Sequence, residues 1–582
     1  MTEPVLSIRD LTVEIPTRHG LFKPVQNVTY DIRPGEIRGV VGESGAGKSM
    51  TGNAIIGLLD DPAKVASGEI WLKGRRIDNL SAEEKRAIRG KEIGMIFQDP
   101  LTSLNPLFTI GEQLVETIQL HLKVTASEAR ERAMALLERV SIPDPATRFD
   151  QYPHQFSGGM RQRVVIALTL CSEPSVIVAD EPTTALDVSI QAQVLDLIKE
   201  LASETQVGVI LVTHDMGVIA DTTEQVTVMY AGKVVESGTT DQVLSAPEHE
   251  YTKSLISAVP RPQVKLHRFP QVSYGGRETS FKIEDLARNW DKTALSKSGK
   301  LLEVKGVTKK FIEKSALLPS RRKYFTAVDD VSFDIRDGEV FGIVGESGSG
   351  KSTVARMIAT LLPTDGGEIH FDGEDTTAMG ADALAGYRKQ IQMIFQDPFS
   401  SLNPRMKVAA IVAEPLLHHK LLPPDQVKAR VRELLDRVGL TRDAGSKYPH
   451  EFSGGQRQRI SIARALATQP RFLICDEPTS ALDVSIQAQI LNILKDLQEH
   501  LGLTMLFISH DLPVVRQMCD RVGVMKQGQL VEMQETEQLF ANPQQEYTAQ
   551  LLRLMPRLSQ LSDQSDAVPG QRQNALNDGT AG

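Results

Sequence analysis

The chain reads Gly42-Glu43-Ser44-Gly45-Ala46-Gly47-Lys48-Ser49 near its start and Gly345-Glu346-Ser347-Gly348-Ser349-Gly350-Lys351-Ser352 beyond its midpoint. Each copy follows a short apolar run, residues 37–41 in the first and 340–344 in the second. Composition alone would give such an eight-residue match about 0.02 times in a chain of this length. Two matches therefore predict two strand-to-helix turns that bind phosphate.

Later motifs recur in the same order, between 296 and 303 positions apart. A spacing this long and this regular indicates a repeat of whole domains. We expect a first domain over residues 1–262, a linker over 263–299 and a second domain over 300–556. The linker is rich in charge, Gly, Pro and Ser, with one short helix expected near residues 283–290. Residues 557–582 are polar and are predicted to form a disordered tail.

Composition is that of an ordinary globular protein, with 41% apolar and 24% charged residues. No stretch approaches the ~18 to 20 apolar residues that a membrane helix needs. The start of the chain lacks the basic and apolar segments of an export signal, so a cytosolic protein is expected. A formal net charge of −9 argues against a protein that coats nucleic acid.

Each copy alternates short apolar runs with helical patterns, which predicts an α/β domain with a mainly parallel sheet. Amphipathic stretches at about 111–148 and 408–444 predict an inserted helical subdomain in each copy.

A nucleotide triphosphate explains the glycine-rich loops chemically. Glycines let the backbone wrap the phosphates, and the following helix presents its positive end to them. Lys48 and Lys351 are placed to reach the β and γ oxygens, and Ser49 and Ser352 to bind Mg²⁺. The predicted phosphate-binding residues are therefore all the residues of the two glycine-rich loops, 42–49 and 345–352.

Acid pairs end two further apolar runs, as Asp180-Glu181 and Asp476-Glu477. The first acid of each pair is expected to hold Mg²⁺, and the second to orient or deprotonate the attacking water. Gln98 and Gln396 follow strands and would reach the metal and the water; His214 and His510 end strands and would contact the γ-phosphate. The predicted catalytic residues are thus Glu181, Glu477, His214, His510, Gln98 and Gln396, and the predicted metal ligands are Ser49, Gln98, Asp180, Ser352, Gln396 and Asp476.

The motifs Phe156-Ser157-Gly158-Gly159-Met160 and Phe452-Ser453-Gly454-Gly455-Gln456 resemble the signature of ATP-binding cassette (ABC) ATPases. The resemblance covers nearly everything outside the linker and tail. It implies two tandem ABC ATPase domains, each with a P-loop (RecA-like) core, an antiparallel β subdomain and an inserted helical subdomain. It also implies that Ser157, Gly158 and Gly159 complete the ATP site of the second domain, and that Ser453, Gly454 and Gly455 complete that of the first.

Two departures from symmetry stand out. The aromatic residue that stacks on adenine in this family matches Phe311, whereas the aligned residue in the first copy is Ile15. The signature ends in Met160 in one copy and in Gln456 in the other. We expect weaker nucleotide binding at the first P-loop.

The stretches 97–106 and 395–404, both of the form FQDPxxSLNP, and the Tyr-Pro-His triplets before each signature resemble dipeptide, oligopeptide and nickel importer ATPases. The first half is similar to the D-type subunit and the second to the F-type; fused versions include those of microcin C and glutathione importers. The resemblance implies an ATPase that powers import, bound to two transmembrane permease subunits at the cytoplasmic face of the inner membrane. An extracytoplasmic substrate-binding protein would be an indirect partner, and nucleic acid would not be a partner.

Many relatives carry a cysteine cluster after the tail tyrosine that can bind an iron–sulfur cluster. Here no cysteine follows Tyr251 before Cys475, and none follows Tyr547. We therefore predict ATP and Mg²⁺ as cofactors and no iron–sulfur cluster.

Soluble twin-cassette proteins that act on ribosomes are the alternative. They typically join their cassettes by a longer, charged helical hairpin, whereas the linker here contains Pro262, Pro270 and Gly275-Gly276. The importer is therefore favoured, and its cargo stays open, because the cargo is not expected to touch this chain.

Overall fold

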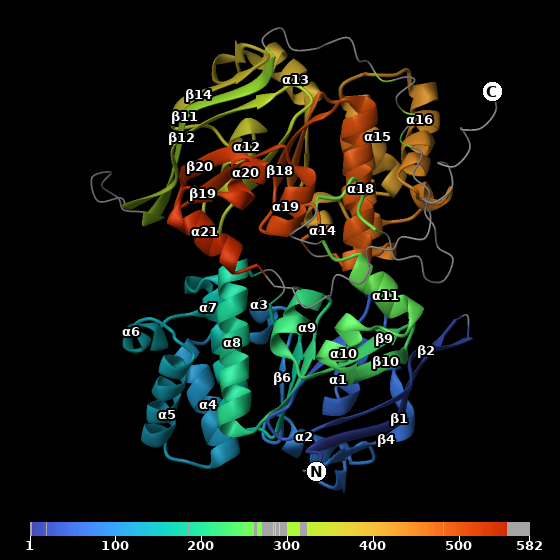
Figure 1. The fold of residues 1–582 in the computed structure, drawn as a ribbon, viewed down its shortest axis with the longest axis vertical. Helices are drawn as coiled ribbons and strands as arrows, with labels where there is room; N and C mark the ends of the chain where they lie inside the picture. Colours follow the sequence, from blue (N-terminus) through green and yellow to red (C-terminus); the bar gives the residue numbers. More distant parts are fainter. Residues whose placement is uncertain are drawn as a thin grey trace, which may run out of the picture.

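The protein is represented by a computed structural model that describes residues 3–18, 20–183, 186–260, 265–270, 283, 286, 290, 299–314, 323–480 and 482–555. The tail predicted to be disordered lies outside the described residues. The two halves of the chain lie one above the other, and the helices α11 (Glu250–Ser257) and α21 (Glu546–Arg553) lie near the boundary between them (Figure 1).

The first half contains two sheets. A four-stranded antiparallel sheet has the order β2-β1-β4-β5 and a six-stranded sheet has the order β10-β9-β3-β8-β7-β6. In the larger sheet all neighbours are parallel except β10, which pairs antiparallel with β9. The strands are β1 (Leu6–Thr17), β2 (Gly20–Ile32), β3 (Ile37–Val41), β4 (Lys64–Leu72), β5 (Arg75–Arg76), β6 (Ile93–Ile96), β7 (Val176–Asp180), β8 (Gly208–Val212), β9 (Gln225–Tyr230) and β10 (Lys233–Thr239).

The second half repeats this topology, with sheets β12-β11-β14-β15 and β16-β17-β18-β13-β19-β20. Its strands are β11 (Lys300–Lys314), β12 (Lys323–Arg336), β13 (Val340–Val344), β14 (Gly366–Phe371), β15 (Glu374–Asp375), β16 (Ile391–Ile394), β17 (Phe472–Asp476), β18 (Thr504–Ile508), β19 (Arg521–Lys526) and β20 (Gln529–Glu535). The two halves thus have the predicted α/β fold, including the antiparallel sheet.

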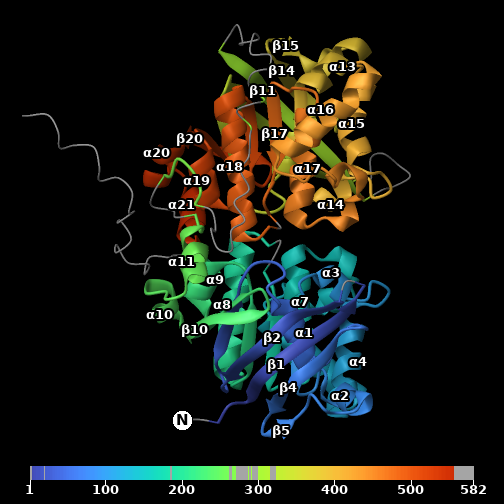
Figure 2. The same cartoon turned by 90° about the vertical axis from the view of Figure 1, so that its right-hand side faces the viewer.

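The inserted helices also appear in both halves. In the first half they are α3 (Pro100–Ser103), α4 (Ile110–Leu122), α5 (Ala126–Arg139), α6 (Pro145–Phe149) and α7 (Gly158–Leu170), and in the second α14 (Pro398–Ser401), α15 (Val408–His418), α16 (Pro424–Arg437) and α17 (Gly454–Leu466). The pair α4 and α5 lies at the left of the lower half, and the pair α15 and α16 at the right of the upper half (Figure 1). In the view at 90°, α4 of the first pair and both helices of the second pair lie on the same side (Figure 2). The halves are therefore related by an approximate twofold rotation.

The remaining helices flank the parallel strands. They are α1 (Lys48–Ile56), α2 (Ala82–Ile88), α8 (Val188–Thr205), α9 (Met216–Thr222), α10 (Thr240–Ser245), α12 (Lys351–Ile358), α13 (Ala381–Gln390), α18 (Val484–Leu501), α19 (Leu512–Met518) and α20 (Thr536–Ala541). Among the described residues, none of the helices combines the length and apolar character required to cross a bilayer.

The central strand of each large sheet positions the site. Strand β3 lies between β8 and β9, and β13 lies between β18 and β19. Parallel neighbours end at the same sheet edge, so the loops after β3, β7 and β8 meet there. These are the loops that carry the P-loop, the acid pair and the strand-end histidine.

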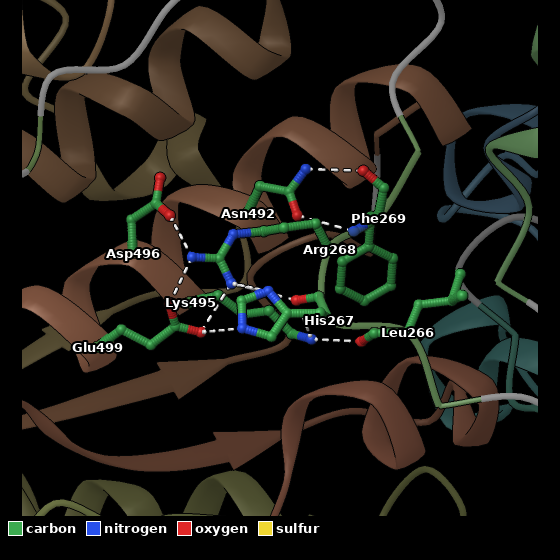
Figure 3. A network of polar contacts seen from close by, with 8 residues as sticks. All are labelled: Leu266, His267, Arg268, Phe269, Asn492, Lys495, Asp496 and Glu499. Carbon is green, nitrogen blue, oxygen red and sulfur yellow. Dashed lines mark hydrogen bonds and ion pairs between the residues drawn. The ribbon is translucent and has the colours of Figure 1, made fainter. Parts of the chain in front are cut away.

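Part of the predicted linker binds the flank of the second half (Figure 3). The Arg268 guanidinium contacts Glu499 at 2.6 and 2.7 Å and Asp496 at 2.8 Å. The Asn492 side chain donates to the carbonyl of Phe269 and accepts its N–H, both at 2.9 Å. Phe269, Ile283, Leu286 and Trp290 are buried in the core of the second half. These contacts attach the segment to α18, whereas the domain boundaries themselves stay predictions.

Lys495 closes the same network. Its ammonium donates to the carbonyls of Leu266 at 2.9 Å and His267 at 3.0 Å. Burial, with the nearby positive charges of Arg268 and Lys265, lowers the pKa of Lys495 to about 8. The amine therefore exchanges part of its hydration for two backbone carbonyls, which fixes the path of the chain along the helix.

We expect Asn492→Ala to loosen this segment. The substitution leaves a buried N–H and a buried carbonyl of Phe269 without partners, at a cost of about 1–3 kcal/mol. Tryptic cleavage after Lys265 and Arg268 should then accelerate roughly tenfold, the factor that corresponds to ~1.4 kcal/mol. The control is Asp196→Ala, at the corresponding exposed position of α8, and equal cleavage rates in the two variants would contradict the role of the network.

Candidate nucleotide sites

The glycines of each P-loop have backbone conformations that side chains avoid. Gly42 has φ 152° and Gly345 has φ 147°, and a Cβ atom there would lie 2.2 Å from the carbonyl oxygen of Met229 and 2.1 Å from that of Met525. Gly47 likewise has φ 97°, and its Cβ would lie 2.3 Å from the oxygen of Pro24. Glycine is required at these positions both by conformation and by space.

The P-loop lysines fold back onto the loop. Lys48 Nζ donates to the carbonyls of Gly42 at 2.7 Å and Glu43 at 3.1 Å. Lys351 makes the same pair of bonds, to Gly345 at 2.7 Å and Glu346 at 2.9 Å. Both side chains are buried. Burial lowers the pKa of Lys351, although Glu477 and Asp187 oppose the shift. Each ammonium thus points into the space that the loop encloses.

The predicted metal ligands meet across the sheet edge. Ser49 Oγ donates to Asp180 Oδ1 at 3.0 Å, and Ser352 Oγ donates to Asp476 Oδ1 at 2.8 Å. Burial raises the pKa of both aspartates. Hydroxyl, carboxylate and amide oxygens suit Mg²⁺, which also keeps waters and phosphate oxygens as ligands. Among the described residues no cluster of three His, Cys, Asp or Glu side chains forms a metal cage, so this donor set fits a metal that arrives with phosphates.

Each predicted catalytic glutamate joins the predicted glutamine and histidine. Glu181 accepts a hydrogen bond from Gln98 Nε2 at 2.8 Å and contacts His214 Nδ1 at 3.2 Å. Glu477 is bound to Gln396 and His510 at the same two distances. Three loops that are distant in the sequence therefore converge on one carboxylate in each half.

The glutamates are held in an unusual backbone conformation. Glu181 has φ 48° and Glu477 has φ 46°. Their N–H groups donate to the last residues of β8 and β18, Val212 at 2.9 Å and Ile508 at 3.0 Å. A left-handed conformation at a non-glycine residue is costly and is retained where surrounding structure fixes it. The strand pairing fixes it here, and it turns each carboxylate toward the glutamine and histidine.

The histidine and the glutamate favour their charged forms in each other's presence. Burial alone lowers the pKa of His510, but its bond to Glu477 and the charges of Glu477 and Asp511 raise it above the ordinary value. The pKa of His214 is raised in the same way by Glu181, and the charge of Asp483 in the other half also raises it. Burial raises the pKa of Glu477, but His510 and Lys351 outweigh it and the net shift is downward.

The signature serines cap helices. Ser157 accepts the N–H of Met160 at 3.3 Å, and Ser453 accepts that of Gln456 at 3.4 Å. Gln456 also accepts the N–H of Ser453 at 3.1 Å, a reciprocal bond that methionine cannot make. The sequence difference between the two signatures is therefore a difference in helix capping.

Two helices approach each other closely at the second signature glycine. A Cβ at Gly159 would lie 2.4 Å from the Ile190 side chain, and one at Gly455 would lie 2.2 Å from that of Ile486. Around Gly158 nothing lies within 4 Å of the corresponding position. Gly158 thus leaves its helix N-terminus open, whereas a Cβ at Gly454 would lie 3.4 Å from Leu482. The second glycine of each motif seats the helix on the following helix.

One hydrogen bond joins a P-loop to the opposite half. Ser347 N–H donates to Asp187 Oδ2 at 3.3 Å. Asp187 Oδ1 also caps α8 by accepting the N–H of Ile190 at 2.9 Å, whereas its counterpart Asp483 does not cap α18. The preceding residues Ala185 and Ala481 lie outside the described residues. Bonds between described residues do not include one from Ser157 or Ser453 to the opposing P-loop, so that pairing stays a prediction.

A cavity of about 180 Å³ lies between the halves. His214 and Met216 line it from the first half, and Glu477, His510 and Leu512 from the second. Because both strand-end histidines face the same cavity, the two sites are adjacent across the boundary.

The adenine-stacking candidate is exposed as that role requires. Phe311 is 39% exposed and lies opposite Phe325 on the neighbouring strand. In the first half Ile15 lies opposite Phe22, which is 54% exposed. Phe22 could not be identified from the sequence, because its pairing with Ile15 depends on the hairpin register. An exposed aromatic side chain is thus present on β2 of the first half, opposite the aligned position.

Two further residues were missed as parts of the site. Tyr251 OH accepts the N–H of Glu43 at 3.0 Å, and Tyr547 OH accepts that of Glu346 at 3.2 Å. Their matching sequence context, Glu-Tyr-Thr near the end of each half, was the available signal.

Comparison with known proteins gives two family matches. The family described as ABC transporter matches residues 25–184 and 328–480. The family described as oligopeptide/dipeptide transporter, C-terminal region, matches residues 235–279 and 531–581.

The chain is 44% identical over 561 residues to the glutathione import ATP-binding protein GsiA of Escherichia coli (strain K12), covering 95% of this chain and 89% of that protein. The match to GsiA of Shigella boydii serotype 4 (strain Sb227) has the same values. A solved dimeric structure of the ATP-binding cassette MJ0796, in a post-hydrolysis state bound to ADP and Pi, is 31% identical; it covers 40% of this chain and 99% of that chain, with a TM-score of 0.37. The sequence relatives support the importer over the ribosome-associated alternative.

The paired glutamate and histidine predict a pH-dependent stability. A histidine whose pKa is raised by folding stabilises the folded state fully below its unfolded pKa of about 6.5, and the contribution is lost as the pH rises through the raised value. The Tm of the nucleotide-free protein should therefore fall as the pH is raised from about 6.5. The double variant His214→Gln/His510→Gln should show a smaller fall by scanning calorimetry.

The control for this measurement is His450→Gln, because His450 is an exposed histidine outside the two sites. This variant should keep the wild-type pH dependence. If the double variant also kept it, the two histidines would not be the groups that titrate.

The adenine faces predict unequal affinities. Lys351→Ala leaves only the first P-loop intact, and Lys48→Ala leaves only the second. Base stacking on an aromatic side chain contributes about 1–3 kcal/mol. In a calorimetric titration we therefore expect ATP to bind Lys351→Ala at least about fivefold more weakly than it binds Lys48→Ala. Equal dissociation constants would contradict the expectation. A lower affinity of Phe22→Ala in the Lys351→Ala background would then identify Phe22 as the stacking residue.

Proposed function

The chain belongs to the ABC transporter family and is the ATP-binding subunit of a peptide-type importer, and we propose that its two halves form two composite ATP sites by head-to-tail pairing. The observation that carries the proposal is the bond from Ser347 to Asp187, which links the second P-loop to the residue that caps α8 in the other half. One site would combine Lys48, Asp180, Glu181 and His214 with Ser453, Gly454 and Gly455; the other would combine Lys351, Asp476, Glu477 and His510 with Ser157, Gly158 and Gly159.

Each residue has a role in hydrolysis that follows from its position. Lys48 and the loop amides would bind the β and γ phosphates, and exchange of the lysine's carbonyl partners for phosphate oxygens makes this bond charge-assisted. Ser49, Asp180 and Gln98 would hold Mg²⁺, which neutralises charge on the phosphate oxygens when bound.

Glu181 would orient the attacking water and accept its proton, while the bond between the terminal phosphorus and the bridging oxygen breaks to give ADP and phosphate. Gln98 would hold that carboxylate and the water in line. His214 would donate to the terminal phosphate, since the imidazole favours its protonated form beside Glu181. The second site would work in the same way through Glu477, Gln396 and His510.

Binding of ATP would stabilise the closed pairing of the halves, and loss of phosphate would let them open. A ligand shifts such an equilibrium only by its differential affinity for the two states. Signature residues supply that difference, because they reach the nucleotide only when the halves are closed. Because Asp187 is bonded to the P-loop of the second half, closure of the halves would act directly on the second site.

Two permease subunits are the proposed recipients of this motion. Exposed apolar side chains follow each glutamine loop, with Leu101 and Phe399 both 60% exposed and Leu107 80% exposed. Such side chains are typical of interaction sites. We place the chain peripherally at the cytoplasmic face of the membrane, with an extracytoplasmic binding protein selecting a peptide or peptide-like solute of the class that the glutathione-importing relatives carry.

The test is affinity purification of the tagged double variant Glu181→Gln/Glu477→Gln from detergent-solubilised membranes with ATP and Mg²⁺. Removal of the two carboxylates should slow hydrolysis by about 100-fold or more and hold the halves closed. Two polytopic membrane proteins should co-purify in equal amounts.

The matched control is Glu200→Gln/Glu374→Gln, which alters one exposed carboxylate in each half, outside both sites. It should hydrolyse ATP at a rate close to wild type. Recovery of ribosomal subunits without membrane proteins would refute the importer assignment, and rapid hydrolysis by the double variant Glu181→Gln/Glu477→Gln would refute the catalytic role of the glutamates.

A further inference from the structure

The C-terminal helix of each half reaches the start of its own P-loop. Tyr251 is the second residue of α11 and Tyr547 the second residue of α21. Each phenolic oxygen accepts a P-loop N–H, from Glu43 at 3.0 Å and from Glu346 at 3.2 Å. We propose that Tyr251 and Tyr547 are positioning residues that hold the P-loops in the shape that binds ATP. This inference rests on the proposed ATP sites.

The first tyrosine is rigidly placed. Its side chain is fully buried, and its ring centroid lies 4.5 Å from that of Tyr230. The ring belongs to a buried cluster that includes Val41, the residue before the P-loop, and Met216, which follows the strand-end histidine. Burial raises the pKa of Tyr251, so the phenol stays neutral and its oxygen remains available as an acceptor. The hydroxyl is thus fixed between the two loops that handle the terminal phosphate.

The hydroxyl completes a clamp on one residue of the loop. Glu43 is held through its N–H by Tyr251 and through its carbonyl by Lys48 Nζ at 3.1 Å. The second half repeats the clamp on Glu346, with the Lys351 contact at 2.9 Å. When ATP arrives, the lysine must leave the carbonyl for the phosphates. The tyrosine bond does not compete with the nucleotide, and it therefore keeps the loop in place while the lysine moves.

In the second half the clamp lies beside the opposite half. Glu346 N–H goes to Tyr547, and the next amide, Ser347 N–H, goes to Asp187 of the first half. Burial raises the pKa of Tyr547 to about 12, with Glu346 and Asp187 adding to the shift. Adjacent amides of one P-loop are thus held by α21 and by the capping residue of α8. These two adjacent amides therefore link the closure of the halves to the position of α21.

Both tyrosines lie in the region matched by the oligopeptide/dipeptide transporter C-terminal family, residues 235–279 and 531–581. That region is separate from the cassette match, which ends at residue 184 in the first half and at 480 in the second. A displacement of α11 or α21 moves the hydroxyl away from the loop. The C-terminal region would therefore set the affinity of the ATP sites through one hydrogen bond in each half.

The test compares Tyr251→Phe and Tyr547→Phe in the full-length protein. Each change removes one oxygen and keeps the ring. A neutral hydrogen bond contributes about 0.5–1.5 kcal/mol, so KM for ATP should rise about three- to tenfold while kcat stays close to wild type. Tyr251→Phe should have the larger effect, because water can replace the hydroxyl at half-exposed Tyr547 but not at buried Tyr251. Hydrogen exchange at the amides of Glu43 and Glu346 should accelerate in the corresponding variant.

Tyr387→Phe is the matched control, since it removes a buried hydroxyl that donates to the carbonyl of Ile358 at 2.6 Å, outside the P-loop; it should leave KM unchanged. A fall in Tm with unchanged KM and unchanged exchange at Glu43 would make the tyrosines purely structural and overturn the inference. ATP binding by wild type that is lost in Lys48→Ala/Lys351→Ala keeps the proposed sites intact whichever result is found. A wild-type chain that binds no ATP would instead refute the proposed function itself.

Discussion

The tight turn at Gly42 and Gly345 is the constraint on which each half depends. The loop passes so close to the carbonyls of Met229 and Met525 that even a methyl group would overlap them. This close approach places the loop against β9 in the first half and against β19 in the second. It also directs the following helix at the predicted phosphate position. The acid pair, glutamine and histidine then reach the same point because their strands are parallel neighbours and end at one edge.

The two halves have the same arrangement of polar side chains around the glutamate, but they differ in the structure that surrounds it. Distances around Glu181 and Glu477 agree closely, and both residues keep a left-handed backbone. The differences lie in helix capping, where Gln456 completes a reciprocal bond that Met160 cannot, and in Asp187, which caps its helix while Asp483 does not. The described part of the linker also binds the second half, through Asn492 and Lys495. Asymmetry therefore enters through the scaffold and the adenine face, not through the reacting groups.

One contact described between the halves is polar and local. A backbone amide of one P-loop meets the carboxylate that caps a helix in the other half. Such a contact is made or lost with small movements, as a switch that opens and closes with the nucleotide requires. Tyr251 of α11 and Tyr547 of α21 also hold the P-loops, from the regions that match the oligopeptide/dipeptide transporter C-terminal family.

The α/β fold, the repeat and the helical insert could be predicted from the sequence, because glycine patterns and strand-end polar residues have few alternative explanations. The same patterns predicted the groups around each terminal phosphate. The sequence did not reveal Phe22, whose role depends on hairpin register, or Tyr251 and Tyr547, which lie about 200 positions from the amides they hold. It also placed residues 263–299 in a linker without showing that Arg268 and Phe269 bind α18. Only the tertiary structure decided these contacts, because they join segments whose approach is set by the packing of whole elements and leaves no local pattern in the chain.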